Sequence, residues 1–125
     1  MKRLFTLISF AFLFSNTQLM AEEFVAKHAT YEKDGKTIEL KDLSGFPNFH
    51  ADYYPTENIV RIKSSAGNLI LKKGLFFYGY SGKHKGLVIT ARAYVEAGKL
   101  DQIAYEEFDE LKNMRVTITY YKKIK

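Results

Sequence analysis

The chain has 125 residues, no cysteine and a formal net charge of +5 at pH 7. This length allows one domain with a single small core, and the lack of cysteine excludes a disulfide framework and a lipoprotein anchor. Charges of both signs are interspersed, so the composition favours anionic envelope polymers, lipid phosphates or another protein over nucleic acid as the partner.

The first 21 residues have the three-part organisation of a secretory signal peptide. Lys2 and Arg3 precede an uncharged apolar run at residues 4–14, and a polar stretch then ends at Ala21. Because the apolar run is about half of the roughly 20 residues that span a bilayer, cleavage is favoured over an uncleaved anchor. We therefore expect residues 22–125 to form one exported domain, periplasmic or secreted from a bacterium, with no transmembrane span after cleavage.

The mature chain opens with two apolar segments in residues 24–40, on either side of Asp34-Gly35. Both residues of this pair tolerate positive φ, so the pair predicts a two-residue hairpin turn. Residues 41–55 contain two prolines, which cannot donate to a strand ladder, and are expected to form a connection or an edge. The four aromatic residues in this stretch are expected to cap one end of the core.

Alternating apolar and polar side chains predict antiparallel strands through the middle of the chain. Val60 and Ile62 share one face of the first of these strands. Residues 87–95 form the clearest strand, strongly apolar and bounded by Gly86 and Gly98. In order, we expect strands at residues 58–63, 69–72, 75–80 and 87–95, with a turn at 64–68, a hinge at Lys73-Gly74 and a loop at 81–86.

After Gly98 the pattern changes and predicts a helix at residues 101–113. Apolar residues recur at a spacing that places them on one stripe of an α-helix, with Asp101 at its start and Asn113 at its end. The stripe consists of Leu100, Ile103, Ala104, Phe108 and Leu111. A strand through residues 101–105 is the alternative, because apolar and polar side chains also alternate there.

Residues 114–121 return to period two, with Val116, Ile118 and Tyr120 facing inward, and residues 122–125 form a frayed basic end. The expected fold is mainly β: an antiparallel sheet, or a short jellyroll or sandwich, of about seven strands with one short helix at residues 101–113 before the last strand. Exposed strand edges would permit self-association.

No catalytic motif is present. Ser81 and His84 lie near Gly79-Tyr80-Ser81-Gly82-Lys83, where lysine replaces the second glycine of a nucleophile elbow, so Ser81-Gly82 is interpreted as turn chemistry. The three histidines stand singly, without metal-ligand spacing. The acids in residues 106–110 could pair for glycoside hydrolysis, but they are more typical of a solvated helix face. We expect no enzymatic activity, no cofactor and no metal.

Four lysines stand in the two turns that flank the strand at residues 75–80. Lys72 and Lys73 occupy one turn, and Lys83 and Lys85 the other. An antiparallel meander would place them at opposite ends of that strand, where they would form two small basic rims. These rims would either bind an anion or serve only to keep the strand ends soluble.

Three segments share an alanine, a tyrosine a few residues later and then an apolar strand. They begin at Ala26, Ala51 and Ala91, with Gly67-Asn68-Leu69 between the second and the third. This sequence pattern resembles the repeats of the OstA-like family, the periplasmic β-jellyroll proteins that carry lipopolysaccharide between bacterial membranes. The resemblance extends over most of residues 24–103.

The resemblance implies a non-enzymatic periplasmic protein that binds an envelope lipid or anionic glycolipid, or assists its transport. Acyl chains would lie between the sheet faces, and the rim lysines Lys72, Lys73, Lys83 and Lys85 would face phosphates. The same apolar side chains could instead fill a dry core. The expected lining is Val60, Ile62, Leu69, Leu71, Phe77, Leu87, Ile89 and Ala91.

An alternative is a small periplasmic inhibitor or protein-interaction module similar to the lysozyme inhibitors, which insert a Ser-Gly loop into the enzyme's cleft. Ser81, Gly82 and His84 would then form the interaction loop. The two functions demand different interiors, because a carrier needs a hollow, whereas an inhibitor needs a packed core with one protruding loop.

Overall fold

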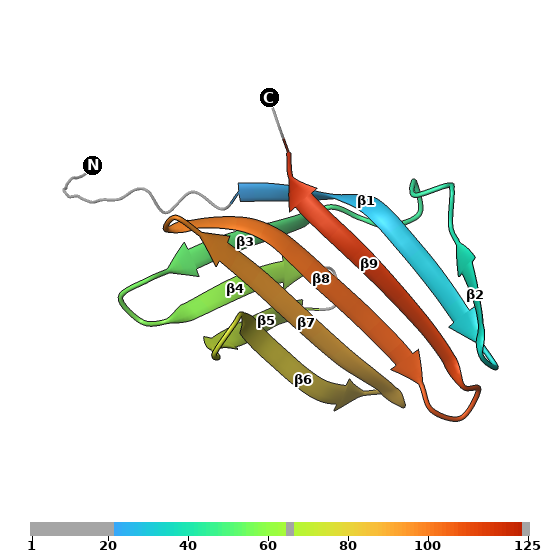
Figure 1. Ribbon diagram of the computed structural model, residues 1–125. Helices are drawn as coiled ribbons and strands as arrows, with labels where there is room; N and C mark the ends of the chain where they lie inside the picture. The colour runs from blue at the N-terminus through green and yellow to red at the C-terminus, as the bar shows by residue number, and fades with distance from the viewer. Residues whose placement is uncertain (1–21, 65–66, 124–125) are drawn as a thin grey trace, which may run out of the picture.

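The computed structural model describes residues 22–64 and 67–123, which form nine antiparallel strands (Figure 1). Eight of these strands close into a barrel in the order β1-β3-β4-β5-β6-β7-β8-β9, and pairing of β9 with β1 completes the ring. The short β2 pairs with β1 outside the ring. The strands are β1 (Glu22–Lys33), β2 (Lys36–Glu39), β3 (Phe49–Tyr54), β4 (Ile59–Ser64), β5 (Gly67–Lys73), β6 (Tyr78–His84), β7 (Leu87–Glu96), β8 (Lys99–Asp109) and β9 (Met114–Lys122).

The predicted antiparallel β fold is confirmed, but the predicted jellyroll is wrong. From β3 to β9 each strand pairs with the next along the chain, which is an up-and-down order, whereas a jellyroll needs the long connections of Greek keys. The hairpin at Asp34-Gly35 is confirmed, since both residues have positive φ, at 51° and 82°. The strands predicted at residues 87–95 and 114–121 are confirmed as β7 and β9.

The helix predicted at residues 101–113 is wrong, because residues 99–109 form β8 and pair with β7 and β9 along most of their length. The pairing with β7 slips between Val95–Leu100 and Tyr94–Gln102, which leaves Asp101 as the extra residue of a β-bulge. This extra residue shifts the alternation by one position. Leu100 and Ile103 therefore both face the core although they are three residues apart, and this spacing imitates a helical stripe.

Two other predicted boundaries are wrong. Residues 49–54, expected to lie in a connection or an edge, form β3, which pairs with both β1 and β4. Pro47 and Pro55 flank this strand and do not interrupt it. Residues 75–77, expected in a strand, lie in the loop before β6. Three predictions fall outside the described residues: the signal peptide predicted at residues 1–21, the middle of the turn predicted at 64–68 and the chain end at 124–125.

Three aromatic rings pack together in the core of the barrel. Phe49 stacks on Tyr120 with ring centroids 4.1 Å apart and meets the edge of Tyr105 at 5.3 Å. The connection between β2 and β3 packs against this core, and the Tyr120 hydroxyl donates to the carbonyl of Pro47 at 3.2 Å. The largest fully buried side chains are Tyr120, Phe24, Ile62, Leu71, Leu100, Ile103 and Val60.

The pairing between neighbouring strands of the barrel is shortest between β5 and β6. These strands share two residue pairs, Lys72–Gly79 and Lys73–Tyr78, whereas β6 and β7 share seven. In Figure 1 the two strands diverge from this short contact. The loop that joins them, residues 74–77, therefore stands at the point where the two strands meet.

Replacing Ile103 by alanine should destabilise the protein by about 2–5 kcal/mol, because this side chain is fully buried in the core. Leu111 is the matched control: it belongs to the same predicted helical stripe, but it lies 94% exposed beyond the end of β8. Leu111→Ala should change the stability by less than about 0.5 kcal/mol. Denaturant unfolding followed by circular dichroism measures both, and equal losses would contradict the strand assignment.

The buried tyrosines make the core sensitive to alkaline pH. Burial raises the pKa of Tyr120 to about 12, and the nearby Glu107 carboxylate adds to the shift. Burial also raises the pKa of Tyr105, whose hydroxyl donates to Glu107 at 2.8 Å. The folded protein therefore keeps these hydroxyls protonated at a pH where the unfolded chain, with tyrosine pKa values near 10, releases the protons.

Stability should fall as the pH rises from about 10 towards 12, because the folded state then binds more protons than the unfolded state. Tyr120→Phe removes one of the groups responsible, so the slope of the unfolding free energy against pH should be shallower in this variant. The comparison is between slopes, measured by urea unfolding from pH 8 to 11.5, and not between absolute stabilities. An unchanged slope would mean that Tyr120 does not contribute.

Candidate functional site

The loop between β5 and β6 presents apolar side chains to solvent. Leu75 is 94% exposed and Phe76 is 85% exposed. The amide of Gly74 donates to the carbonyl of Phe77 at 2.8 Å and closes the loop into a tight turn. A Cβ at Gly74 would lie 2.9 Å from that carbonyl oxygen, so the turn requires glycine here.

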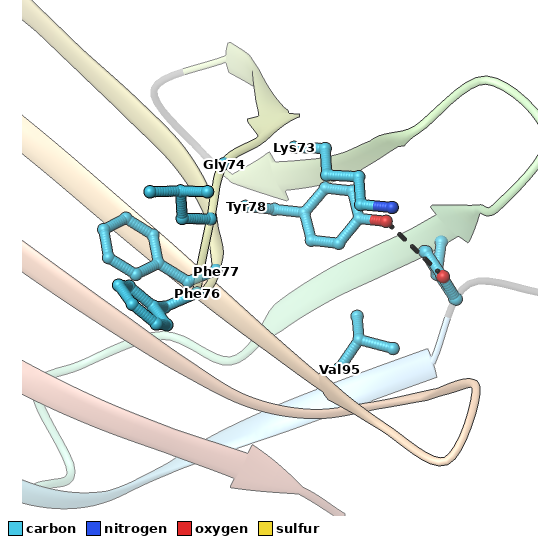
Figure 2. Close-up of a pocket in the computed structure, with 8 residues that line it drawn as sticks. Lys73, Gly74, Phe76, Phe77, Tyr78 and Val95 are labelled. Carbon is cyan, nitrogen blue, oxygen red and sulfur yellow. Dashed lines mark hydrogen bonds between the residues drawn. The ribbon is translucent and has the colours of Figure 1, made fainter.

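A pocket of about 240 Å³ lies beneath this loop (Figure 2). On one side the hydroxyls of Tyr53 and Tyr78 lie 3.5 Å apart, the hydrogen bond that is dashed in Figure 2. This hydrogen bond, together with burial, raises the pKa of Tyr53. Lys73 lies beside Tyr78 in Figure 2, and its charge partly offsets the rise in the pKa of Tyr53. The pocket is lined by Tyr53, Lys73, Gly74, Leu75, Phe76, Phe77, Tyr78 and Val95.

A second hollow, an open groove of about 540 Å³, lies on β6 and β7 and shares Phe77 with the first. The register pairs Gly79 with Arg92 and Ser81 with Thr90. These four residues lie on the outer face, because the residues that alternate with them, such as the fully buried Ala91, face the core. The groove therefore combines an aromatic ring, two hydroxyls and one arginine.

Arg92 differs from the other arginines of the described chain in its partners. Arg61 donates to the buried Asp52 at 2.7 Å, and Arg115 forms ion pairs with Glu106 at 3.3 Å and Glu32 at 3.5 Å. Within residues 22–64 and 67–123, Arg92 has no carboxylate partner, and its guanidinium lies 5.8 Å from the centre of the Phe77 ring. Its charge is therefore not neutralised within the described protein.

The predicted apolar lining divides into three groups. Val60, Ile62, Leu71, Ile89 and Ala91 are buried in the core, and Leu69 packs against it. Leu87 is half-buried at the start of β7. Phe77 is placed differently, since its ring lies near Arg92 and Tyr94 on the outer face, 5.9 Å from the Tyr94 ring. Of the predicted lining, Phe77 lines both hollows described above and Ala91 lines the groove.

The four predicted rim lysines lie towards opposite ends of β6, as expected from a meander. Lys72 and Lys73 end β5 beside the exposed loop. At the other end, Lys83 forms an ion pair with Glu110 at 3.1 Å, and Lys85 occupies the turn to β7. The first pair stands next to the exposed Leu75 and Phe76.

The loop predicted at residues 81–86 is wrong, because Ser81, Gly82 and His84, the predicted interaction residues, belong to β6 and pair with β7. The turn consists of Lys85 and Gly86 alone, with φ values of 53° and 85°. Two consecutive residues with positive φ are typical of a two-residue hairpin turn, which lets the strands extend up to it. No long loop protrudes here.

The acids that a helix would have gathered are separated by the strand. Glu106 faces outward to Arg115, whereas Glu107 faces inward and accepts from Tyr105. Asp109 accepts hydrogen bonds from the amides of the following turn. In the part of the chain that the structure describes, no group of three His, Asp or Glu side chains is placed to hold a metal ion.

Comparisons with protein-family models, with curated proteins and with solved structures find no match to this chain. None of the residues in the described ranges belongs to a helix that could cross a membrane. The resemblance to the OstA-like family therefore stays a prediction.

Sequence reasoning missed Leu75, Phe76 and Arg92 as site residues. Leu75 and Phe76 were assigned to a strand because they continue an apolar run. The available signal was Gly74, which separates them from β5. Arg92 was visible as the one charged residue within the most apolar strand, a position where a cation needs a partner or a function.

Proposed function

We propose that the protein is a non-enzymatic binding protein of the bacterial envelope that attaches to anionic lipid or glycolipid through the β5–β6 loop. The observation that supports this proposal is the pair Leu75 and Phe76, which are almost fully exposed at the tip of a closed turn. Single exposed apolar residues are common. Two adjacent ones beside a pocket and two lysines are typical of an attachment site.

The energetics favour a lipid surface as the partner. Burying a leucine or phenylalanine side chain contributes about 1.5–3 kcal/mol, so insertion of Leu75 and Phe76 would supply several kcal/mol. Each lysine near an anionic surface adds about 1 kcal/mol, and Lys72 and Lys73 flank the loop. The pocket beneath the loop, lined by Tyr53 and Val95 among others, would accommodate part of an acyl chain.

The expected attachment is different from the carrier mechanism that the family resemblance implies. Most of the predicted lining is buried in the core, so the proposed contact is at the loop and not between sheet faces. The alternative of a lysozyme inhibitor lacks a supporting observation, because Ser81 and Gly82 belong to β6 and pair with β7 and do not form a protruding loop.

The test is flotation with vesicles of phosphatidylethanolamine and phosphatidylglycerol. The parent protein should float with these vesicles, and the double variant Leu75→Ser/Phe76→Ser should bind at least about tenfold more weakly, because it loses the inserted apolar surface. Substitution at the fully exposed loop should leave the fold intact, which circular dichroism verifies.

Leu111→Ser is the matched control, since Leu111 is as exposed as Leu75 but lies in the turn between β8 and β9. This variant should bind like the parent. Failure of the parent to float, or equal weakening by Leu111→Ser, would refute the proposal. High salt should weaken the binding, because the lysine contribution is screened.

A further inference from the structure

We infer that the groove beside Arg92 is a phosphate site, which holds the headgroup phosphate of the lipid. Arg92 supplies the charged donor, and the hydroxyls of Ser81 and Thr90 supply neutral donors. The inference rests on the proposed function for the source of the phosphate, but the phosphate chemistry rests on the groove itself.

The register of β6 and β7 brings the three donors together. Ser81 and Thr90 are directly opposite each other, and Arg92 follows Thr90 by two residues on the same face. Two residues along a strand correspond to about 7 Å, a distance that an arginine side chain can cross. All three residues line the groove of about 540 Å³, together with Tyr80 and Ala91, so their side chains border one open space.

The charge of the groove is positive and uncompensated. Arg92 has no carboxylate partner in the described chain. Its Nε is buried without a hydrogen-bond acceptor, as are those of Arg61 and Arg115, so the missing carboxylate is what sets Arg92 apart. The acid closest in register is Glu106, which lies opposite Thr90 on β8, but its carboxylate is paired with Arg115. A phosphate would accept from the guanidinium, which binds such groups through two parallel hydrogen bonds.

Gly79 leaves room for the Phe77 ring, which forms part of the lining of the groove. A Cβ at this position would lie 3.1 Å from Cε1 of Phe77, so the ring of Phe77 already reaches across the glycine. Phe77 also lines the pocket under the loop. A lipid whose phosphate lies at Arg92 would therefore have its acyl chains next to Phe77, Leu75 and Phe76.

The inference is tested by recording amide and arginine side-chain NMR signals during titration with inorganic phosphate and, separately, with dihexanoylphosphatidic acid. Both should shift the signals of Ser81, Thr90 and Arg92. Arg92→Gln should weaken the binding of both ligands at least about tenfold, because the charged donor is lost. The dispersion of the spectrum verifies that each variant is folded.

Two further variants distinguish an effect of the groove itself from an effect of the protein's net charge. Lys36→Gln removes the same charge on the exposed β2, outside the barrel ring, and should bind both ligands like the parent. Gly79→Ala keeps Arg92, but its methyl group would press against the Phe77 ring that lines the groove, so this variant should also weaken binding. Equal behaviour of Arg92→Gln and Lys36→Gln, or no shifts at the groove, would overturn the inference.

The outcomes distinguish this inference from the proposed function. Vesicle binding that depends on Leu75 and Phe76 but is unaffected by Arg92→Gln would overturn the phosphate site and leave lipid attachment intact. Phosphate binding at Arg92 by a protein that does not float with vesicles would support the phosphate site and refute lipid attachment.

Discussion

The two-residue ladder between β5 and β6 determines what this barrel presents to its surroundings. Every other connection between successive strands from β3 to β9 has at least five residue pairs. Strands β5 and β6 are joined by only two residue pairs, and the turn at residues 74–77 connects them. The exposed apolar tip, the pocket beneath it and the groove beside Arg92 all adjoin this point, because Phe77 contributes to both hollows.

The strands could be predicted where alternation is regular, and the prediction failed where it is interrupted. Val116, Ile118 and Tyr120 alternate without a break, so β9 was predicted correctly. In β8 the bulge at Asp101 moves the inward side chains from even to odd positions. A one-residue insertion of this kind is invisible to a pattern that counts positions along one strand, because the pairing with β7 decides which residue is extra.

The candidate site was harder to predict than the fold. The lysines beside the loop were recognised from the sequence, but their value as a site depends on the exposed Leu75 and Phe76, and exposure follows from the path of the chain after Gly74. The importance of Arg92 depends on the lack of a carboxylate partner within the described residues. Arg61 and Arg115 stand in comparable strands. Only the pairing of β4 with β3, and of β9 with β8 and β1, reveals that they are neutralised while Arg92 is not.

The hydrogen bond between Gly74 and Phe77 has a consequence for the speed and selectivity of attachment. A flexible apolar loop would lose conformational entropy whenever it met a surface, and it could adapt to many shapes. Here the tip is already held in one geometry by its own backbone. The loop can thus contact a surface without first changing its conformation. Because the loop keeps its shape, it should favour partners that can deform around Leu75 and Phe76.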